Sequence, residues 1–281
     1  MAGTVSVGRR RALRASAAAI AAASGTGLPP EASARADDLA SSGRPSTDEP
    51  PPFSALAAGT HWETADAATS QPSGRGGDAQ HGWLHRRLRG ITPNRFSIVH
   101  EAGKSILAVD VKASASALTY RFQSMPSRPT LRWRWRAEQF PERAEPGLKA
   151  RDDFAARLYL MFDLPEARLS FADRLALATA GLLQGEPVPA ATLVYLLHQG
   201  RTTDHPVASP FTDRVVMWVA RGDAQAGRWY EESRNWQQDF QRAFGQRYPG
   251  PIPSPVAIAV GADGDQTGAS FRAMWGDLSF G

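Results

Sequence analysis

The stretch Leu131-Arg132-Trp133-Arg134-Trp135-Arg136 decides the fold, because large apolar and basic side chains alternate along it without interruption. Successive side chains of a β-strand point to opposite faces, so a period of two predicts a strand that is buried on one side. The tryptophans and Leu131 would face a hydrophobic core, and the three arginines would face solvent. We therefore expect a β-sheet with one covered face and one polar face.

Short runs of the same kind lie on both sides of this strand, separated by turn-forming segments such as Glu101-Ala102-Gly103-Lys104. Two other segments show the spacing of helices. Many short strands with few helices indicate a mainly β domain, a β-sandwich or jelly-roll-like fold with one or two inserted helices. The expected strands are at residues 96–99, 105–109, 118–122, 131–136, 154–162, 193–197, 214–219, 255–260 and 271–280, and the expected helices are at residues 171–183 and 236–244.

The first 36 residues have the three parts of a secretion signal. Arg9, Arg10 and Arg11 precede an alanine-rich apolar run, and small-x-small cleavage sites follow at residues 32–34 and 34–36. The paired arginines resemble a twin-arginine signal, and the alternatives are a Sec signal, an organellar transit peptide or a wrongly chosen start codon. We therefore expect an exported protein, periplasmic or extracellular, in which residues 1–36 are a signal peptide.

Residues 37–80 are rich in Ser, Pro, Gly, Thr and Ala and hold few large apolar side chains. Such a segment cannot bury enough surface to offset its ordering entropy, so the composition predicts a disordered low-complexity spacer. The β-sandwich domain would then occupy residues 81–281. No apolar run approaches the ~20 residues that span a bilayer, so no transmembrane segment is expected. The chain has no cysteine, which excludes disulfides and Cys-ligated metals.

The formal net charge of +4 belongs to the expected leader and not to the domain. Residues 1–36 contain five arginines and one glutamate, which leaves 27 basic and 27 acidic residues for the remainder of the chain. Proteins that bind nucleic acid need a basic surface that displaces counterions from phosphates. The balanced charge therefore argues against a nucleic-acid partner.

Several short motifs follow one another in a recognisable order along residues 83–281. They are Trp133-Arg134-Trp135, residues 152–159 (DDFAARLY), Leu193-Val194-Tyr195, Arg228-Trp229, Asp239-Phe240, Phe244-Gly245, residues 263–267 (DGDQT) and residues 276–280 (GDLSF). In this order they resemble a bacterial family called domain of unknown function 3047, whose members are mostly exported. Val194, Leu197, Gly264 and Gln266 depart from the family pattern. The resemblance implies the extent of the domain and brings no activity with it.

Arginines and carboxylates gather on the polar sides of three expected strands. If the strands at residues 118–122, 131–136 and 154–162 are neighbours, one outer face carries these side chains together. Such a face would bind an anionic ligand, for example an acidic glycan, by bidentate pairing of arginine with carboxylate. The alternative is an ordinary solvated face, in which Asp152 or Asp153 balances an arginine across strands. The candidate ligand-binding residues are Arg134, Arg136, Asp153, Arg157 and Tyr159, with Arg121 and Arg132 on the same side.

The segment Asp263-Gly264-Asp265-Gln266-Thr267-Gly268 matches the opening of a calcium-binding loop, because oxygen-bearing side chains alternate before a glycine. Met274 stands where such a loop has its bidentate glutamate, so further ligands would have to come from Asp277 or Asp152. The candidate Ca²⁺ ligands are Asp263, Asp265, Thr267 and Asp277. The alternative is a polar turn whose aspartates cap backbone amides.

Motifs of catalysis are sparse in the sequence. It has no G-x-S-x-G elbow, H-E-x-x-H helix, P-loop or dinucleotide fingerprint. Glu231 and Glu232 are adjacent, so on a strand they would face opposite sides and could not form the carboxylate pair of a retaining glycosidase. Arg157, Tyr159 and His198 remain as a lyase-like acid/base set if the fold brings them together.

We therefore expect a non-catalytic, exported domain that binds a glycan or a cell-envelope component, an expectation that owes much to fold-level analogy with sugar-binding jelly rolls. One rival is a polysaccharide-active enzyme, a lyase or hydrolase on a jelly-roll scaffold. The other is a structural envelope protein whose ligand, if any, is another protein. Ca²⁺ is the one cofactor that the sequence suggests, and the sequence does not indicate an oligomeric state.

Overall fold

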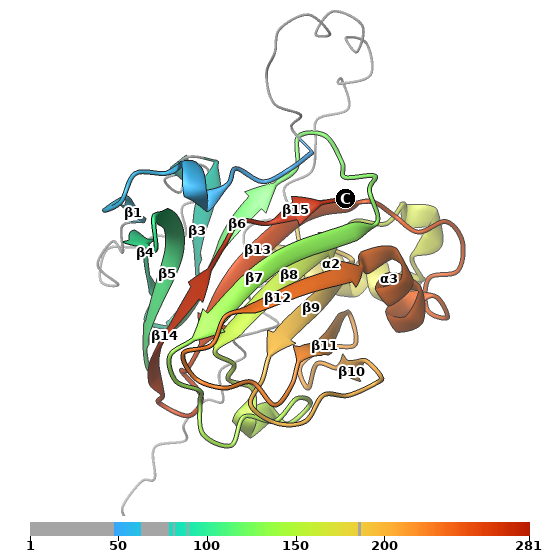
Figure 1. Ribbon diagram of the computed structural model, residues 1–281. Coiled ribbons are helices and arrows are strands. Elements are labelled where there is room, and N and C mark those ends of the chain that lie inside the picture. Colours follow the sequence, from blue (N-terminus) through green and yellow to red (C-terminus); the bar gives the residue numbers. More distant parts are fainter. Residues whose placement is uncertain (1–47, 63–78, 81, 89, 185–186) are drawn as a thin grey trace, which may run out of the picture.

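The computed structural model describes residues 48–62, 79–80, 82–88, 90–184 and 187–281. These residues form two curved β-sheets that pack face to face, with two α-helices and three short 3-10 helices (Figure 1). The predicted mainly β, sandwich-like fold with inserted helices is therefore confirmed. The predicted signal peptide at residues 1–36 lies outside the described residues.

One sheet has seven strands, all of whose pairs run antiparallel. They are β1 (His61–Trp62), β4 (Arg95–Glu101), β5 (Lys104–Lys112), β7 (Thr130–Ala137), β12 (Tyr230–Asn235), β14 (Ser270–Trp275) and β15 (Ser279–Phe280). Their order is β1-β4-β5-β14-β7-β12, and β15 pairs with the first residues of β7. The strand that was predicted at residues 131–136 thus lies near one edge of this sheet.

The other sheet has eight strands. They are β2 (Ala79–Gln80), β3 (Trp83–Arg87), β6 (Ala115–Arg121), β8 (Ala156–Phe162), β9 (Ala191–Leu197), β10 (Val207–Ala208), β11 (Val215–Arg221) and β13 (Pro255–Asp263). Their order is β10-β11-β9-β8-β13-β6-β3-β2, with β9 and β11 parallel and the other pairs antiparallel.

Aromatic side chains fill the space between the two sheets. Leu131, Trp133 and Trp135 alternate inward from β7, as their period of two predicts. The Trp133 ring meets the Tyr195 ring of the opposite sheet at a centroid distance of 5.2 Å, so the sheets interlock through large side chains. Burial of this aromatic surface is the main term that stabilises the sandwich.

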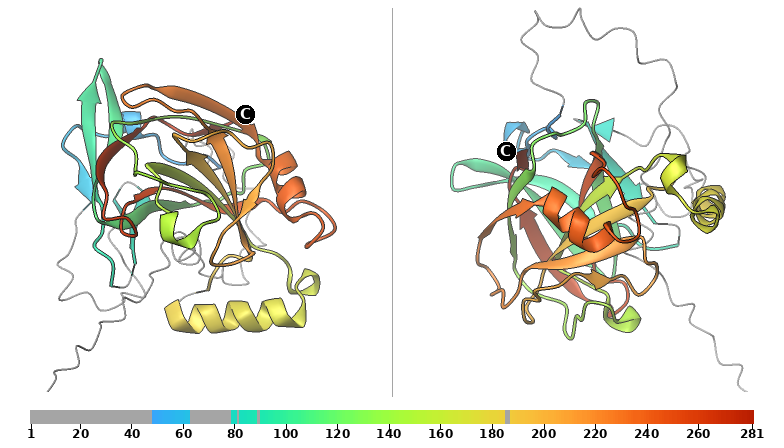
Figure 2. Two further views of the ribbon diagram at one scale, coloured as in Figure 1. Left: turned by 90° about the horizontal axis from the view of Figure 1, so that it is seen from below. Right: turned by 90° about the vertical axis from the view of Figure 1, so that its right-hand side faces the viewer.

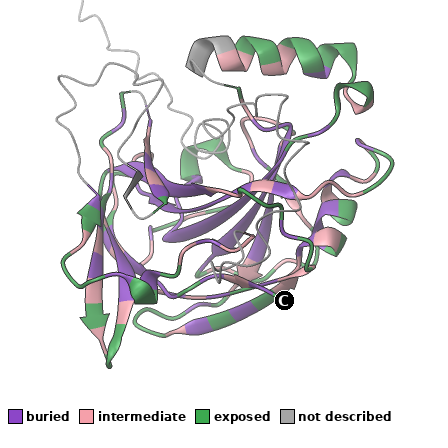
Figure 3. Ribbon diagram, turned by 90° about the horizontal axis from the view of Figure 1, so that it is seen from above, coloured by how far each residue is buried: buried purple, intermediate pink, exposed green. Residues whose placement is uncertain are grey.

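The eight-stranded sheet is buried on its other face as well, which we call its second face. Every residue of β8 and of β9 is buried (Figure 3). Tyr159, Met161 and Val194 belong to a second hydrophobic cluster there, separate from the one that contains Trp133. A central strand of this sheet therefore has no solvent-facing side.

Two α-helices accompany the sheets. Helix α3 (Trp236–Phe244) begins at Asn235, whose side chain accepts a hydrogen bond from the Gln238 amide, and its Phe240 ring lies 4.8 Å from that of Phe162. Helix α2 (Phe171–Gln184) lies along the outer side of the eight-stranded sheet (Figure 2) and leaves Phe171 75% exposed. The 3-10 helices are η1 (Phe53–Ala55), η2 (Lys149–Arg151) and η3 (Glu166–Arg168). No helix among the described residues is long and apolar enough to cross a membrane.

Residues 48–62 correct the predicted boundary of the spacer. Phe53 in η1 is fully buried and stacks on Trp83 at 4.9 Å, and the Trp62 indole donates a hydrogen bond to the Trp83 carbonyl. The prediction of a disordered spacer is therefore wrong for this segment, because two aromatic side chains anchor it to the sandwich despite its polar composition. Residues 37–47 and 63–78 of the predicted spacer lie outside the described residues.

The single arginine-rich outer face that the sequence suggests does not exist. Strand β7, with Arg134 and Arg136, pairs with β12, β14 and β15, whereas β8, with Arg157 and Tyr159, pairs with β9 and β13 in the other sheet. Arg157 and Tyr159 do point away from the space between the sheets, but both are fully buried on the second face. Alternation assigns side chains to faces and does not identify the neighbouring strand, which is why the five candidates separate.

Candidate functional site

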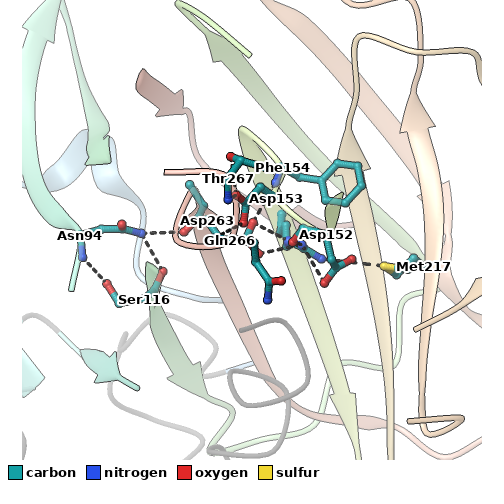
Figure 4. Close-up of polar contacts among 11 residues, drawn as sticks. Asn94, Ser116, Asp152, Asp153, Phe154, Met217, Asp263, Gln266 and Thr267 are labelled. Carbon is teal, nitrogen blue, oxygen red and sulfur yellow. Dashed lines mark hydrogen bonds and ion pairs between the residues drawn. The ribbon is translucent and has the colours of Figure 1, made fainter. Parts of the chain in front are cut away.

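A polar network lies where β8 begins and β13 ends (Figure 4). Asp152, Asp153, Arg157 and Asp263 each have no exposed surface. The Arg157 guanidinium donates from Nε to Asp263 Oδ1 at 2.7 Å and from Nη2 to the Asp152 carbonyl at 2.5 Å. Its Nη2 also lies 2.7 Å from Asp263 Oδ2 and 3.2 Å from Asp152 Oδ2. Arg157 thus holds two aspartates from separate segments, and buried charges require such partners.

Asp153 organises the turn between β13 and β14. Its Oδ2 accepts hydrogen bonds from the Thr267 amide and the Thr267 hydroxyl, both at 2.7 Å. Its Oδ1 accepts a third from the Gln266 amide at 3.3 Å. The turn is therefore capped by a carboxylate from another segment, whereas the alternative in the sequence analysis was capping by the aspartates of the turn itself.

Asn94 ties a third segment to the same end of the sheet. Its side-chain amide donates to the carbonyls of Ser116 and Ala262 at 3.1 and 2.7 Å, and its Oδ1 accepts from the Ser114 hydroxyl at 2.8 Å. Because Ala262 precedes Asp263 in the chain, the hydrogen bond to the Ala262 carbonyl fixes the backbone that carries the Asp263 carboxylate. The described polar groups of Asn94 are satisfied within the protein, as burial demands.

Phe154 is held in place by the network. Asp263 Oδ1 accepts a hydrogen bond from the Phe154 amide at 2.9 Å, and the Asp263 amide donates to the Phe154 carbonyl at 3.2 Å. The Arg157 guanidinium lies 4.6 Å from the centroid of the Phe154 ring, a cation–π contact. Asp263 therefore fixes the backbone of Phe154, and its partner Arg157 contacts the Phe154 ring.

Phe154 also lines a pocket of about 220 Å³. Three segments surround this pocket: the loop after β7, the residues before β8 and the end of β9. Most of its lining is apolar, and Arg143 and Gln199 are exposed at its rim, a composition typical of small-ligand sites. The described lining residues are Phe140, Pro141, Arg143, Ala144, Phe154, Ala155, Leu197, His198, Gln199 and Gly200.

His198 is the polar group deepest in this pocket. Its ring packs edge-on against the Phe154 ring at 5.4 Å, and neither ring nitrogen has a hydrogen-bond partner among the described residues. Burial lowers the pKa of His198, although the charges of Asp223 and Glu145 oppose this, so the imidazole is neutral at physiological pH. A neutral imidazole offers one donor and one acceptor to a ligand.

Two backbone features shape the pocket around this imidazole. A Cβ atom at Gly200 would stand 2.4 Å from His198 Nε2, so a larger residue there would push the imidazole out of its present position. Arg143 at the rim has a φ of +59°, in the left-handed region, which costs a non-glycine residue on the order of 1–3 kcal/mol. Such backbone strain is concentrated at functional sites more than elsewhere.

The charges of the buried network do not balance if all of its carboxyls are ionised. Burial raises the pKa of Asp152 and of Asp263, against the opposing attraction of Arg157. Burial likewise raises the pKa of Tyr159, whose hydroxyl has no hydrogen-bond partner among the described residues. One guanidinium faces several aspartates, so we expect Asp152 or Asp263 to hold a proton at neutral pH.

The four candidate calcium ligands do not come together. Asp277 follows the far end of β14 and accepts hydrogen bonds from Ser54 at 2.9 and 2.5 Å, away from the turn that holds Asp265 and Thr267. Among the described residues no group of three or more His, Cys, Asp or Glu side chains is placed to hold a metal ion. Arg157 already supplies the positive charge that Asp263 faces, so the predicted Ca²⁺ set is not assembled.

The arginines of β7 lie on the outer face of the seven-stranded sheet. Arg136 pairs with both oxygens of Glu101 at 2.8 Å and with Glu138 at 2.9 Å, whereas the alternative of an ordinary solvated face named Asp152 or Asp153 as the balancing residue. Arg134 lies over the Trp229 ring at 4.8 Å, and Arg136 lies over the same ring at 5.0 Å. These arginines therefore separate from Asp153, Arg157 and Tyr159 and are largely occupied by intramolecular contacts.

The proposed acid/base set is also divided. His198 lines the pocket, whereas Arg157 and Tyr159 are buried behind its Phe154 wall and do not line it. Glu231 is exposed and Glu232 is buried against Arg221 and Trp135, which confirms that they face opposite sides of β12. Sequence reasoning missed the pocket because its walls come from loops without periodicity.

Comparison with solved structures finds proteins of low similarity. Endoglucanase Cel12A from Rhodothermus marinus is 12% identical, with 70% of this chain and 94% of that chain covered and a TM-score of 0.38. Endoglucanase 3 of family GH12 from Trichoderma harzianum is 9% identical, with coverages of 71% and 91% and a TM-score of 0.39. The xyloglucanase domain of NopAA, a type three effector from Sinorhizobium fredii solved with cellobiose, is 10% identical, with coverages of 75% and 99% and a TM-score of 0.37. Likeness at this level carries no information on function.

Comparison by sequence is more specific. Among curated proteins, none matches the chain. A family model does match residues 81–279, which are most of the chain and include β3 to β14, the buried network and the pocket. The protein therefore belongs to the family described as protein of unknown function (DUF3047).

Proposed function

We propose that the protein is an exported, non-catalytic domain that binds a glycan of the cell envelope or its surroundings, and that the pocket beside Phe154 receives the ligand. The observation that carries this proposal is the lining of the pocket, in which two phenyl rings and other apolar groups surround one neutral imidazole. Export is inferred from the leader pattern of residues 1–36.

The chemistry of a sugar ring matches such a lining. A pyranose presents C–H groups on its faces and hydroxyl groups around its edge, so it needs apolar contact and hydrogen bonding in the same small space. Phe140 and Phe154 supply apolar surface with low conformational entropy cost. His198 in the floor and Gln199 at the rim supply donors and acceptors for hydroxyls.

The placement of the carboxylates favours binding over hydrolysis. A retaining glycosidase needs two carboxyl groups about 5–5.5 Å apart on either side of the scissile bond. Asp152, Asp153 and Asp263 are instead buried and engaged with Arg157 or backbone amides. The described residues that line the pocket include no Asp or Glu.

A polysaccharide-active enzyme is the second candidate, and His198 is the observation that favours it. An imidazole that is neutral at physiological pH can accept a proton, which is what a general base must do. The two functions differ in one measurable property, because an enzyme releases shorter products and a binding domain returns the glycan unchanged.

The test is incubation of the protein with immobilised envelope and extracellular polysaccharides, with retention of protein and release of sugar both measured. We expect retention on at least one polysaccharide without product. Phe140→Ala, which removes a pocket wall, should abolish retention, whereas Phe171→Ala, the same substitution at an exposed site, should preserve it. Retention on none of them would refute glycan binding, and released product would establish the enzyme.

A further inference from the structure

We propose that the pocket receives a single uncharged sugar unit at the end of a glycan chain, and does not bind along the chain. This inference rests on the proposed function and specifies its ligand. It is carried by the size of the pocket, by the buried residues of its floor and by the position of His198 within it.

The size of the pocket sets the number of sugar units. Its volume of about 220 Å³ equals that of roughly seven liquid water molecules at ~30 Å³ each. Pockets that enclose drug-sized ligands are larger, about 300–1,000 Å³. One sugar ring fills the available space, and the next unit of a chain must remain outside.

The floor of the pocket is formed by buried residues. Phe154, Ala155 and Leu197 line it with almost no exposed surface, whereas Arg143 and Gln199 are exposed at the rim. The exposed residues mark the side from which a ligand enters. A terminal sugar unit needs one glycosidic bond to leave so small a space, whereas an internal unit needs two, so we infer that the pocket takes a chain end.

The charges around the pocket favour an uncharged unit. Arg143 is the one fully charged residue among the described lining residues, and it lies exposed at the rim. A sugar carboxylate at the floor would meet the neutral His198, with Asp223 and Glu145 acting on that imidazole from nearby, and would lose its hydration without gaining a cation. The hydroxyl groups of a neutral sugar match the imidazole, because each is both a donor and an acceptor.

Gly200 makes this arrangement testable without removal of a ligand-contacting side chain. A methyl group at residue 200 would approach His198 Nε2 to 2.4 Å, so Gly200→Ala must displace the imidazole. Gly103→Ala is the matched control, since its Cβ would have no neighbour within 4 Å in the turn between β4 and β5, although its φ of +77° makes the substitution strained. The control therefore loses stability without a change in the pocket.

The experiment uses the full chain and a polysaccharide that it retains. Soluble competitors are added at equal mass: the intact polysaccharide, its partial acid hydrolysate, and the methyl glycosides of glucose, galactose, mannose, N-acetylglucosamine and glucuronic acid. We expect the hydrolysate to compete in proportion to its number of chain ends, and a neutral glycoside to compete better than the glucuronide. Gly200→Ala should lower the affinity at least tenfold, and Gly103→Ala should leave it unchanged.

Four outcomes overturn the inference. Affinity per chain that rises with chain length would show binding along the chain, and the proposed function would stand. Stronger competition by the glucuronide would show an acidic ligand. Full affinity in Gly200→Ala, or in His198→Phe should the first variant not fold, would place the ligand elsewhere. Retention of no polysaccharide would refute the proposed function itself and the inference with it.

Discussion

Replacement of Asp263 with alanine should lower the free energy of unfolding by about 3–5 kcal/mol, the usual cost of breaking a buried ion pair by removal of one partner. Asp263 Oδ1 accepts hydrogen bonds from the Phe154 amide at 2.9 Å and from Arg157 Nε at 2.7 Å, and its Oδ2 lies 2.7 Å from Arg157 Nη2. Each charge-assisted hydrogen bond contributes about 1.5–3 kcal/mol. Two such bonds account for the expected loss, because the variant leaves a buried guanidinium with Asp152 as its remaining ion-pair partner.

The assay is equilibrium unfolding in urea, with Asp110→Ala as the control. Asp110 also forms a bidentate pair, with Arg272 at 2.6 and 2.9 Å, but both side chains are partly exposed, so its loss should cost about 0–1 kcal/mol. If the folded state is retained, the urea concentration at the midpoint of unfolding should fall, and the slope of the unfolding free energy against urea concentration should stay the same. Equal losses for the two variants would refute the claim that burial makes the Asp263 pair different.

Three further predictions concern the pH dependence and the packing of the sandwich. Burial holds the pKa of Asp152 above its unfolded value of about 3.9, so the associated stability is present in acid and is lost as the pH rises through the raised pKa. In urea unfolding between about pH 4 and about pH 8, the free energy of unfolding of Asp152→Asn should therefore fall less than that of the parent protein. An equal fall in both proteins would show that Asp152 is ionised in the folded parent. Asn235→Ala, which removes the cap of α3, should cost about 1 kcal/mol in the same assay, and no loss would mean that water replaces the cap. Phe162→Ala should cost about 3–5 kcal/mol and Phe171→Ala no more than about 0.5 kcal/mol by thermal or urea unfolding, and comparable costs would contradict the core assignment.

The strands could be predicted from the sequence because their signal is local. Alternation in residues 131–136 and 118–122 identified β7 and β6, and their flanking turns placed their ends to within a few residues. Strand β12 was missed because its sequence, Tyr-Glu-Glu-Ser-Arg-Asn, is polar and lies at a sheet edge, where few apolar contacts are needed. Helix α3 was recognised from aromatic residues at a spacing of four.

The candidate site could not be predicted to the same degree, because its geometry depends on strand order. Arg157 looked solvent-facing, since it alternates with Leu158 and Leu160, and that pattern is typical of a strand with one wet side. Nothing local indicates that the second face is covered, so the charge was assigned to the surface and not to a buried network. The contact between Arg157 and Asp263 joins residues 106 positions apart.

The turn at residues 263–268 shows how one composition serves two physical roles. Alternating oxygens suit either a cation or a set of backbone amides, and the sequence left both open. The structure uses the oxygen of Asp153, from a distant segment, to bind the amides of Gln266 and Thr267. Asp153, which lies outside the motif, determines that these amides are bound by a carboxylate, so the motif alone does not distinguish a capped turn from a cation site.

Residues 48–62 bear on where the domain can be truncated. A shortened protein that began at residue 81, where the family match begins, would remove Phe53 from the face of Trp83 and the Pro51 carbonyl that accepts its indole hydrogen at 3.0 Å. The newly uncovered aromatic surface would promote self-association, because large exposed apolar patches attract one another in water. The segment that the family model matches is thus shorter than the segment that folds, and expression from residue 48 or earlier keeps Trp83 covered by Phe53.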